Sequence, residues 1–248
     1  MDEFKISEKD YNIDSEITPR SITRATPTTI KTAVIERRFD DLGLAPWLLD
    51  SCKELGFEAP TSVQYNTIPA ILSGDDVLAS AKTGQGKTAA FALPILSALS
   101  ENRYGVFAVV LTPTRELAVQ IAEQIRTLGN AINVDCRVVI AGVAIEDALQ
   151  SLTVDNDDKR PHIIVATPGR LSDNLNDTMK QALQHCRFLV LDEADHLLAY
   201  GFEFEVKRII EHLPPKIQTL LFSSTLTTMN KKLELFQLKN PYIFEDNQ

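Results

Sequence analysis

The amino-acid sequence predicts an α/β domain built on a mostly parallel sheet with helices on both faces. Short runs rich in valine, isoleucine and leucine recur along the chain and alternate with helical stretches. Such near-continuous apolar runs are typical of parallel strands buried on both faces. A glycine-rich loop, Ala81–Thr88, joins one of these runs to a helix, and another run ends in acidic residues at Asp192. Ligands bind at the carboxyl ends of such strands, so the fold class also predicts where a site lies.

The composition and charge of the chain exclude several classes of protein. Its 248 residues are 44% hydrophobic and 24% charged, which is ordinary for a globular domain. No apolar run approaches the ~20 residues of a membrane span, and residues 1–30 lack a signal-peptide pattern. The formal net charge of −9 argues against general nucleic-acid binding, so any nucleic-acid site must be local. We expect an intracellular, monomeric domain with no membrane association.

The three cysteines are expected to be buried, reduced thiols. Cys52, Cys136 and Cys186 are widely spaced and have apolar neighbours. This spacing does not fit a metal site, and buried reduced thiols fit a reducing intracellular compartment.

The N-terminal part of the chain predicts a tail followed by two short helices. Residues 1–36 are rich in Thr, Ser, Glu, Asp and Lys without sustained periodicity, which predicts a disordered tail. Pro46–Leu55 places four apolar side chains on one side of a helix. After a turn at Gly56, a second helix is expected over Ser62–Leu72, with Pro60 before its start.

The central part of the chain carries the alternation of strands and helices. The expected strands are Val77–Ser80, Val106–Thr112, Arg137–Ala141, Ile163–Ala166, Phe188–Leu191, Thr219–Phe222 and a short one at Tyr242–Phe244. The expected helices among them are Ala89–Leu99, Arg115–Leu128, Glu146–Leu152, Arg170–Asn174, Phe202–Leu213 and Lys231–Leu238. Residues 153–160 are polar and charged, which predicts a loop. Because the composition does not change again, we expect one domain over residues 37–248.

The segment Ala81–Thr88, reading AKTGQGKT, predicts a phosphate-binding loop. It lies between an expected strand and an expected helix. Gly84 and Gly86 let backbone N–H groups converge, and the helix N-terminus favours negative charge. Lys87 supplies a cation for the phosphates, and Thr88 a hydroxyl for Mg²⁺. Ala81 stands where the strict pattern has glycine. The alternative, a glycine turn followed by a surface lysine, does not explain the strand, loop and helix order.

The acids that follow Phe188–Leu191 predict the second half of an active site. The order is Asp192-Glu193-Ala194-Asp195. The first acid of such a strand end holds Mg²⁺ against the nucleotide phosphates, and Glu193 is placed to orient or deprotonate the attacking water. An acidic first turn of a helix starting at Asp195 would also account for these residues. The phosphate loop upstream favours the catalytic interpretation.

Together these two motifs resemble those of the DEAD-box RNA helicases of superfamily 2. Four further motifs of that family's first RecA-like domain appear in order: GFEAPTSVQ at Gly56–Gln64 with Phe39 upstream (the Q motif), PTRELAVQ at Pro113–Gln120, TPGRL at Thr167–Leu171, and Ser223-Ser224-Thr225. The resemblance implies a RecA-like P-loop domain over residues 37–248 with its Q motif at 37–65. The disordered tail, 1–36, and the short Q-motif helices precede the sheet.

The resemblance also implies ATP and Mg²⁺ as cofactors and a role for each motif residue. The implied nucleotide-binding residues are Phe39, Ala59, Gln64, Ala81, Lys82, Thr83, Gly84, Gln85, Gly86, Lys87 and Thr88, with Thr88 and Asp192 as metal ligands. The implied catalytic residues are Lys87, Asp192, Glu193, Asp195, Ser223 and Thr225, of which Ser223 and Thr225 hydrogen-bond the acids. The implied RNA-contacting residues are Pro113, Thr114, Arg115, Gly142, Thr167, Pro168, Gly169 and Arg170.

Some of these residues have plainer interpretations when taken alone. Gln64 could be a helix surface residue, and Arg115 and Arg170 could be helix N-terminal residues or ion-pair partners. The motif context favours adenine recognition by Gln64 and phosphate binding by the two arginines.

The sequence departs from the family pattern at two positions. Gly142-Val143 stands where the family commonly has two glycines, and Ser224 where it usually has alanine. Val143 could reshape an RNA contact, and the Ser224 hydroxyl is expected to find a partner.

The implied activity is RNA-stimulated ATP hydrolysis coupled to local strand separation of RNA, with backbone contacts to single- or double-stranded RNA. The family's second RecA-like domain is expected to be absent from this chain, so nucleotide binding should survive and unwinding be lost. Three segments, Tyr104–Thr112, Val119–Leu128 and Leu220–Thr227, resemble a nucleolar subgroup that processes small-subunit pre-ribosomal RNA. That resemblance implies a nuclear or nucleolar location.

Two other classes of function stay open on the sequence alone. A non-enzymatic RNA clamp would bind ATP without turnover, but it would have no need of Glu193. A DNA-directed helicase of the same superfamily would share the phosphate loop, and dependence on the 2′-hydroxyl group would separate it from an RNA helicase.

Overall fold

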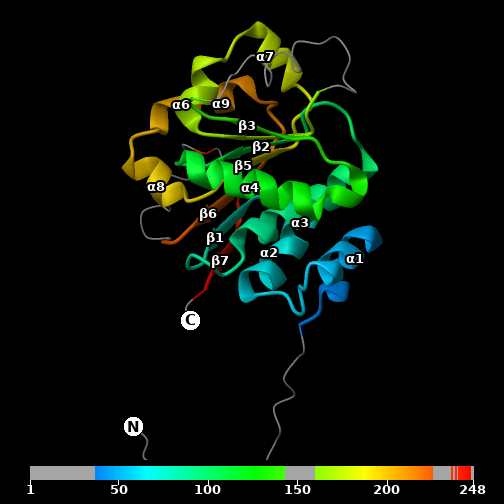
Figure 1. Cartoon of the computed structure of the whole chain (residues 1–248). Helices are drawn as coiled ribbons and strands as arrows, with labels where there is room; N and C mark the ends of the chain where they lie inside the picture. The colour runs from blue at the N-terminus through cyan, green and yellow to red at the C-terminus, as the bar shows by residue number, and fades with distance from the viewer. Residues whose placement is uncertain (1–36, 143–159, 226–235, 237, 239, 247–248) are drawn as a thin grey trace, which may run out of the picture. The chain divides into compact units, whose positions relative to one another are not determined.

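The computed structural model describes residues 37–142, 160–225, 236, 238 and 240–246 (Figure 1). These residues belong to one compact unit, Glu36–Gln248. The predicted tail (1–36), the helix predicted over Glu146–Leu152, nearly all of the 153–160 loop and most of the helix predicted over Lys231–Leu238 lie outside the described residues.

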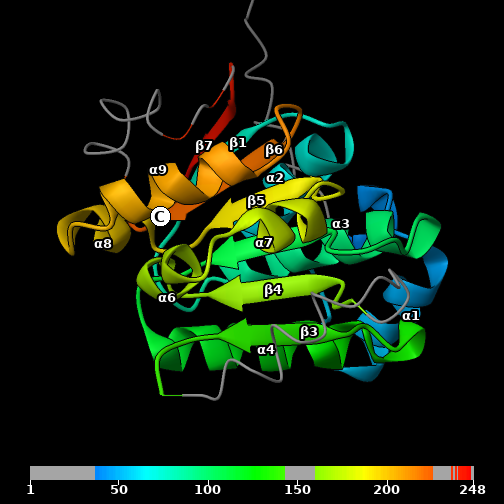
Figure 2. The ribbon, with the colours of Figure 1, turned by 90° about the horizontal axis from the view of Figure 1, so that it is seen from above.

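A parallel sheet of seven strands forms the centre of this unit, in the order β3-β4-β2-β5-β6-β1-β7. Every paired neighbour runs parallel, and the arrowheads of β3, β4 and β5 point to the same side in Figure 2. The strands are β1 (Val77–Ser80), β2 (Ala108–Leu111), β3 (Cys136–Val139), β4 (Ile163–Ala166), β5 (Phe188–Leu191), β6 (Gln218–Ser223) and β7 (Tyr242–Glu245). The predicted parallel α/β class is confirmed.

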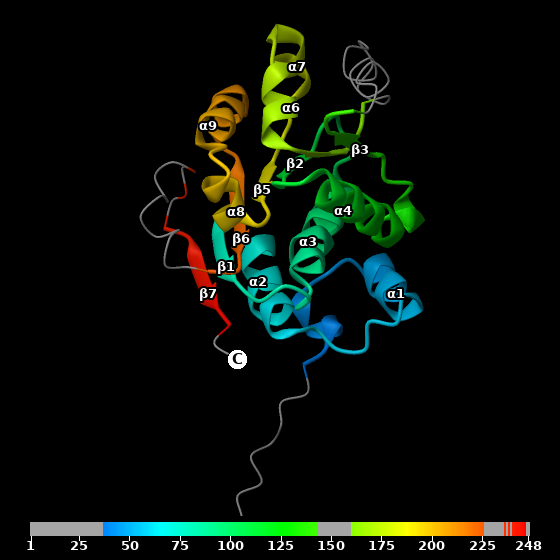
Figure 3. The ribbon, with the colours of Figure 1, turned by 60° about the vertical axis from the view of Figure 1, so that its left-hand side comes forward.

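The described helices cover both faces of the sheet (Figure 3). On one face lie η1 (Phe39–Leu42), α1 (Pro46–Glu54), α2 (Ser62–Leu72), α3 (Lys87–Glu101), α4 (Arg115–Leu128) and the short turn η2 (Asn130–Ile132). On the other lie α6 (Pro168–Asp173), α7 (Asp177–Ala182), α8 (Ala194–Ala199) and α9 (Glu203–His212). The sheet therefore has a hydrophobic core on each side.

The buried strands divide their side chains between these two cores. In β5, Phe188 and Val190 belong to the core under α1–α4, whereas Leu189 and Leu191 belong to the core under α6–α9. Successive side chains of a strand point to opposite faces, so a strand buried on both faces must be apolar throughout. This is the physical reason for the continuous apolar runs in the sequence.

The observed boundaries differ from the predicted ones where local chemistry sets the helix ends. α6 begins at Pro168 rather than Arg170, because proline with its fixed φ suits the first turn of a helix. α3 begins at Lys87, two residues earlier than predicted, directly after the glycine loop. α7 was not predicted; it is six residues long, and the Asn176 side chain caps it by accepting from the Met179 N–H. The predicted bounds of α2 and α4 are confirmed.

All three cysteines are free and buried, as predicted. Burial raises the pKa of Cys52 to about 11 and those of Cys136 and Cys186 to about 12. These thiols therefore stay protonated and unreactive at neutral pH. Among the described residues, no helix combines the length and apolar character needed to cross a membrane.

Candidate nucleotide and RNA site

Three of the motif loops meet because of the order of the strands. β6 lies between β1 and β5 and pairs with both. Ser80 pairs with Ser223, and the Ala81 N–H donates to the Ser223 carbonyl over 3.1 Å. The glycine loop after β1, the acids after β5 and the Ser-Ser-Thr turn after β6 therefore share one edge of the sheet. This is the edge at which parallel α/β sheets bind ligands.

The glycine loop leaves the N-terminus of α3 open to an anion. Gly84 and Gly86 adopt left-handed φ angles of 86° and 81°, a conformation that favours glycine. Gly86 is the N-cap residue of α3, and no side chain caps the helix there. The first N–H groups of a helix need partners, and phosphate oxygens are suitable ones.

Lys87 lies inside this loop. Its side chain is buried, and Nζ donates to the Ala81 carbonyl over 2.8 Å. The loop is further braced by Gln85, whose side-chain Oε1 accepts from the Lys82 N–H over 2.8 Å. Thr88 follows as the second residue of α3 and is partly buried. A cation and a hydroxyl thus stand at the start of the helix, as the motif predicts.

Gln64 joins the Q-motif helix to the glycine loop. Its Oε1 accepts from the Thr61 N–H over 3.0 Å, which completes a capping box at the start of α2. Its Nε2 donates to the Gly86 carbonyl over 3.1 Å. The side chain is only 2% exposed. Gln64 therefore has structural partners on both sides of its amide, and these two bonds leave one N–H and one lone pair of the amide unused.

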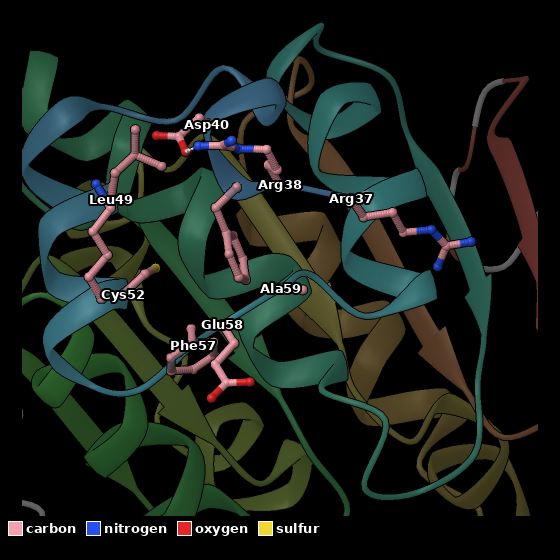
Figure 4. Close-up of a pocket in the computed structure, with 10 residues that line it drawn as sticks. Arg37, Arg38, Asp40, Leu49, Cys52, Phe57, Glu58 and Ala59 are labelled. Atoms are coloured by element: carbon pink, nitrogen blue, oxygen red, sulfur yellow. Dashed lines mark hydrogen bonds and ion pairs between the residues drawn. The ribbon is translucent and has the colours of Figure 1, made fainter. Parts of the chain in front are cut away.

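Phe39 and Ala59 line a separate cavity of about 460 Å³. The lining residues include Arg37 to Asp40, Leu49 and Cys52 of α1, and the segment from Phe57 to Ala59 (Figure 4). The Phe39 ring meets the Phe57 ring edge-on, with 6.0 Å between the centroids. The structure brings Phe39 and Ala59 together, but Gln64 is not in the wall of this cavity.

Asp192, the first residue after β5, is a buried acid. Burial raises its pKa to about 6, and nearby Lys87 opposes this shift. Among the described residues, its buried Oδ1 has no hydrogen-bond partner. An unpartnered carboxylate oxygen at the end of β5 fits a hard cation such as Mg²⁺. No group of three or more acids, histidines or cysteines capable of holding a metal occurs in the described part of the chain. A magnesium ion here would depend on one or two protein groups, nucleotide phosphates and water, which is its usual mode in nucleotide sites.

Glu193 adopts a left-handed backbone conformation at the junction of β5 and α8, with φ of 49°. Its Oε2 lies 3.0 Å from Nδ1 of His196. This hydrogen bond raises the pKa of His196. Non-glycine residues with positive φ carry strain and cluster at functional sites. The sequence analysis did not identify His196; its place one helical turn after Glu193 was the available signal.

Asp195 connects the acids to the turn after β6. It accepts from the Ser224 hydroxyl, from the Ser224 N–H over 3.3 Å and from the Thr225 hydroxyl over 3.4 Å. The Ser223 hydroxyl donates to the Thr225 carbonyl over 2.9 Å. Partial burial acts to raise the pKa of Asp195, but the hydrogen bonds from Ser224 and the His196 N–H, with the nearby His196 ring, outweigh burial and hold the pKa below its usual value. The Ser224 hydroxyl thus has the partner that the sequence analysis expected.

The remaining motif loops lie on the other half of the same sheet edge, after β2, β3 and β4. Thr114 caps α4 through its hydroxyl oxygen, and Arg115 is exposed as the first residue of that helix. Gly142 lies against the Arg115 guanidinium: a methyl group there would stand 2.9 Å from Nη2. The loop after β2 and the turn after β3 therefore meet. Val143 lies outside the described residues.

The loop after β4 presents the last predicted RNA contacts. Thr167 is the N-cap residue of α6, without a side-chain cap, and Pro168 is buried. Gly169 and Arg170 are partly exposed. Within the described residues, buried Nε of Arg170 has no hydrogen-bond partner. Helix N-termini with arginines nearby are suited to phosphate groups.

This arrangement defines a nucleotide-binding α/β domain with acids opposite a phosphate loop. Residues 61–233 match the DEAD/DEAH box helicase family, and the chain belongs to that family. It is 59% identical over 214 residues to the probable ATP-dependent RNA helicase ddx49 of Dictyostelium discoideum, covering 86% of this chain and 41% of that protein. It is 46% identical over 219 residues to the probable ATP-dependent RNA helicase DDX47 of Homo sapiens, covering 87% and 47%.

Two solved structures of DEAD-box proteins have a fold similar to that of this chain. A DEAD box protein from the hyperthermophile Methanococcus jannaschii matches with a TM-score of 0.74 and 33% identity, covering 84% of this chain and 55% of that chain. A variant of S. cerevisiae Dbp5 bound to RNA and ADP BeF3 matches with a TM-score of 0.72 and 28% identity, covering 85% and 52%. The chain spans less than half the length of the two curated relatives named above.

Proposed function

We propose that this chain is the nucleotide-binding domain of an ATP-dependent RNA helicase. ATP binds at the loops after β1, β5 and β6, and the RNA backbone binds at the loops after β2, β3 and β4. The observation that carries the proposal is the strand order, which brings both sets of loops to one sheet edge. The names of the two curated relatives and the RNA-bound structural relative support it.

The phosphate groups of ATP would be held by the open N-terminus of α3 and by Lys87. Thr88 and Asp192 would hold Mg²⁺, which when bound neutralises charge on the phosphate oxygens. Gln64 would offer its remaining amide groups to the adenine edge, with Phe39 and Ala59 close to the base. The hydrogen bond between Gln64 and Gly86 would couple base recognition to the phosphate loop.

Glu193 would orient the attacking water and accept its proton. Its position suits this role because it follows Asp192 at the end of β5, where Lys87 is close to Asp192. Asp195 would transmit the state of the nucleotide to the turn after β6, because it accepts hydrogen bonds from Ser224 and Thr225. The bound RNA would be contacted through its phosphates by eight residues. These are Pro113, Thr114, Arg115, Gly142, Thr167, Pro168, Gly169 and Arg170. Contacts to phosphates predict little sequence preference.

The rest of the parent protein would complete both sites. Relatives about twice as long leave room for a second domain, and we propose that unwinding needs it. The resemblance to a nucleolar subgroup extends the proposal to pre-ribosomal RNA processing. Nucleolar enrichment of the fluorescently tagged protein is expected, and its exclusion from the nucleus would contradict this extension.

Two substitutions in the full-length protein test the proposed chemistry. Glu193→Gln should retain ATP binding but abolish RNA-stimulated turnover, because only the group that accepts the water proton is lost. Lys87→Ala should weaken ATP binding itself, because a phosphate-binding cation is lost. Titration calorimetry and a phosphate-release assay separate the two effects. Turnover by Glu193→Gln at the parent rate would contradict the role of Glu193.

A further inference from the structure

We propose that His196 is a positioning residue that holds the Glu193 carboxylate in the orientation needed to activate water. The inference rests on the proposed function, in which Glu193 accepts the proton of the attacking water. His196 itself does not contact the nucleotide in this scheme. It acts only through the carboxylate that it holds.

The contact between the two side chains has a defined direction. His196 Nδ1 lies 3.0 Å from Glu193 Oε2. An ionised carboxylate only accepts hydrogen bonds, so Nδ1 carries the proton and donates it to Oε2. This leaves the second oxygen, Oε1, to accept a hydrogen bond from water. The Glu193 side chain is only 18% exposed. A hydrogen bond from a protein donor therefore stabilises its carboxylate more than it would stabilise a fully exposed one.

The imidazole ring is itself held in place. It stacks on the Tyr200 ring at an interplanar angle of 29°, with 6.1 Å between centroids. The His196 N–H donates to Asp195 Oδ1 over 3.1 Å. The residue therefore touches two of the motif acids, one through its side chain and one through its main chain. The charged groups that influence it are Glu193, Asp195 and Lys87.

Glu193 needs such a partner because its own backbone does not direct the carboxylate. Its φ of 49° turns the chain from β5 into α8, and three side-chain torsions lie between that turn and the carboxylate. A catalytic group held within a narrow range of orientations reacts faster than a mobile one. His196 removes this freedom without adding a group to the space in front of Oε1.

In the reaction concerned, the water oxygen forms a bond to the terminal phosphorus of ATP. The bond from that phosphorus to the bridging oxygen breaks, with its electron pair passing to ADP, and the water proton passes to Glu193. His196 keeps its own proton throughout. A histidine that merely stabilised α8 would have no effect on this step.

The test uses RNA-stimulated ATP turnover by the full-length protein with three substitutions. His196→Ala should lower kcat about tenfold, part of the ~10²–10⁴-fold that a positioned base contributes, with the KM for ATP unchanged. His196→Asn should restore most of the rate, because the asparagine N–H group can stand near the position of Nδ1. His185→Ala removes an exposed histidine that lies outside the motifs and pairs with Gln184, and it serves as the control with the parent rate.

The outcomes separate the inference from the proposed function. Absence of ATP turnover in the unsubstituted protein would overturn the proposed function and the inference with it. Parent turnover in His196→Ala, or equal losses in His196→Ala and His196→Asn, would overturn the inference alone. A rise in the KM for ATP with kcat unchanged would also overturn it. Thermal unfolding of each variant accompanies the assay. A kcat loss that disappears when rates are corrected for the folded fraction counts against the inference.

Discussion

At the scale of single residues, the three motif acids differ in their partners. Asp195 accepts hydrogen bonds from Ser224 and Thr225, and Glu193 accepts one from His196. Asp192 is 5% exposed and, among the described residues, its Oδ1 has no partner. The chain therefore keeps a poorly solvated carboxylate where the proposed metal ion binds. Such a group costs stability in return for function.

We predict that Asp192→Asn stabilises the nucleotide-free chain at neutral pH. The pKa of Asp192 is raised from 3.8 to about 6, so the folded state binds this proton more tightly than the unfolded state. The Asp192 carboxyl therefore contributes favourably to the free energy of unfolding below about pH 4, and this contribution is lost as the pH rises through about 6. Asparagine carries no such charge, so we expect a gain of about 1–3 kcal/mol in unfolding free energy at pH 7.5. Urea unfolding measures this gain.

The pH series supplies the control for this prediction. The difference between Asp192→Asn and the parent should shrink toward zero as the pH is lowered to about 4, because the parent carboxyl is then protonated. A gain that did not change with pH, or a loss of stability at pH 7.5, would contradict the assigned cause. Mg²⁺-dependent binding of ADP should weaken in the same variant.

At the scale of elements, the loop between β1 and α3 is tied to α2 as well as to the sheet. The Gln64 amide donates to Gly86 and accepts from Thr61. A side chain at Gly86 would collide with Gln64 Nε2. The Q-motif helix and the phosphate loop therefore adjust as a unit, which links recognition of the base to binding of the phosphates.

We predict that Gly86→Ala weakens ADP binding and reduces the preference for ADP over GDP. The new methyl group displaces the Gln64 amide, and lost hydrogen bonds to a base edge cost ~1–3 kcal/mol. The left-handed φ of 81° adds strain of ~1 kcal/mol to the folded chain. Titration calorimetry with ADP and GDP measures both affinities on the 248-residue chain.

Gly74→Ala is the matched control. Gly74 has a φ of 92°, yet a methyl group there would meet nothing within 4 Å. The control should lose similar stability while ADP binding and selectivity stay at the parent values. Equal effects of the two substitutions on ADP affinity would mean that strain, rather than the contact with Gln64, explains the loss. Equal affinity of the parent for ADP and GDP would contradict the adenine role of Gln64.

At the scale of the whole molecule, two sets of loops lie on the two halves of one sheet edge. The net charge of the chain limits how strongly the proposed RNA loops can bind RNA. The nucleotide loops follow β1, β5 and β6, and the proposed RNA loops follow β2, β3 and β4. The chain carries a formal net charge of −9. The cations that meet RNA are therefore few, with Arg115 and Arg170 the main ones in the proposed site.

We predict that residues 1–248 alone bind single-stranded RNA weakly and unwind no duplex. Because few phosphates are neutralised, the salt dependence of affinity should be shallow, about −0.7 per phosphate contacted. An ATP analogue should change this affinity little. The full-length protein should bind tightly only with the analogue. Fluorescence anisotropy at several salt concentrations measures both.

Two single-charge variants sharpen this measurement. Arg115→Ala should reduce RNA affinity and make the salt slope shallower by about one phosphate contact. Lys53→Ala removes an equal charge from α1, outside the proposed RNA loops, and should leave both quantities at the parent values. Strand separation or analogue-dependent tight binding by residues 1–248 would overturn the prediction.

Most of the fold could be predicted because its signals are local. The apolar runs of β1, β4 and β5 were predicted with their observed bounds, since a strand buried on both faces must be apolar throughout. α7 could not be predicted in the same way, because its six residues are too few for a helical period to appear. His196 was missed for a different reason: its position one helical turn after Glu193 does not by itself distinguish a partner of that carboxylate from a surface histidine.

By itself, the sequence determined the α/β class, the phosphate loop at Ala81–Thr88, the acids from Asp192 and the family to which the chain belongs. These features depend on neighbours along the chain and on spacings that can be read in one dimension. Only the tertiary structure decided that β6 separates β1 from β5, that Gln64 bonds to Gly86, and that Ser224 and His196 hold two of the acids. Strand order and side-chain partners follow from pairing and packing between segments far apart in sequence, and from burial, which removes water as a competing partner.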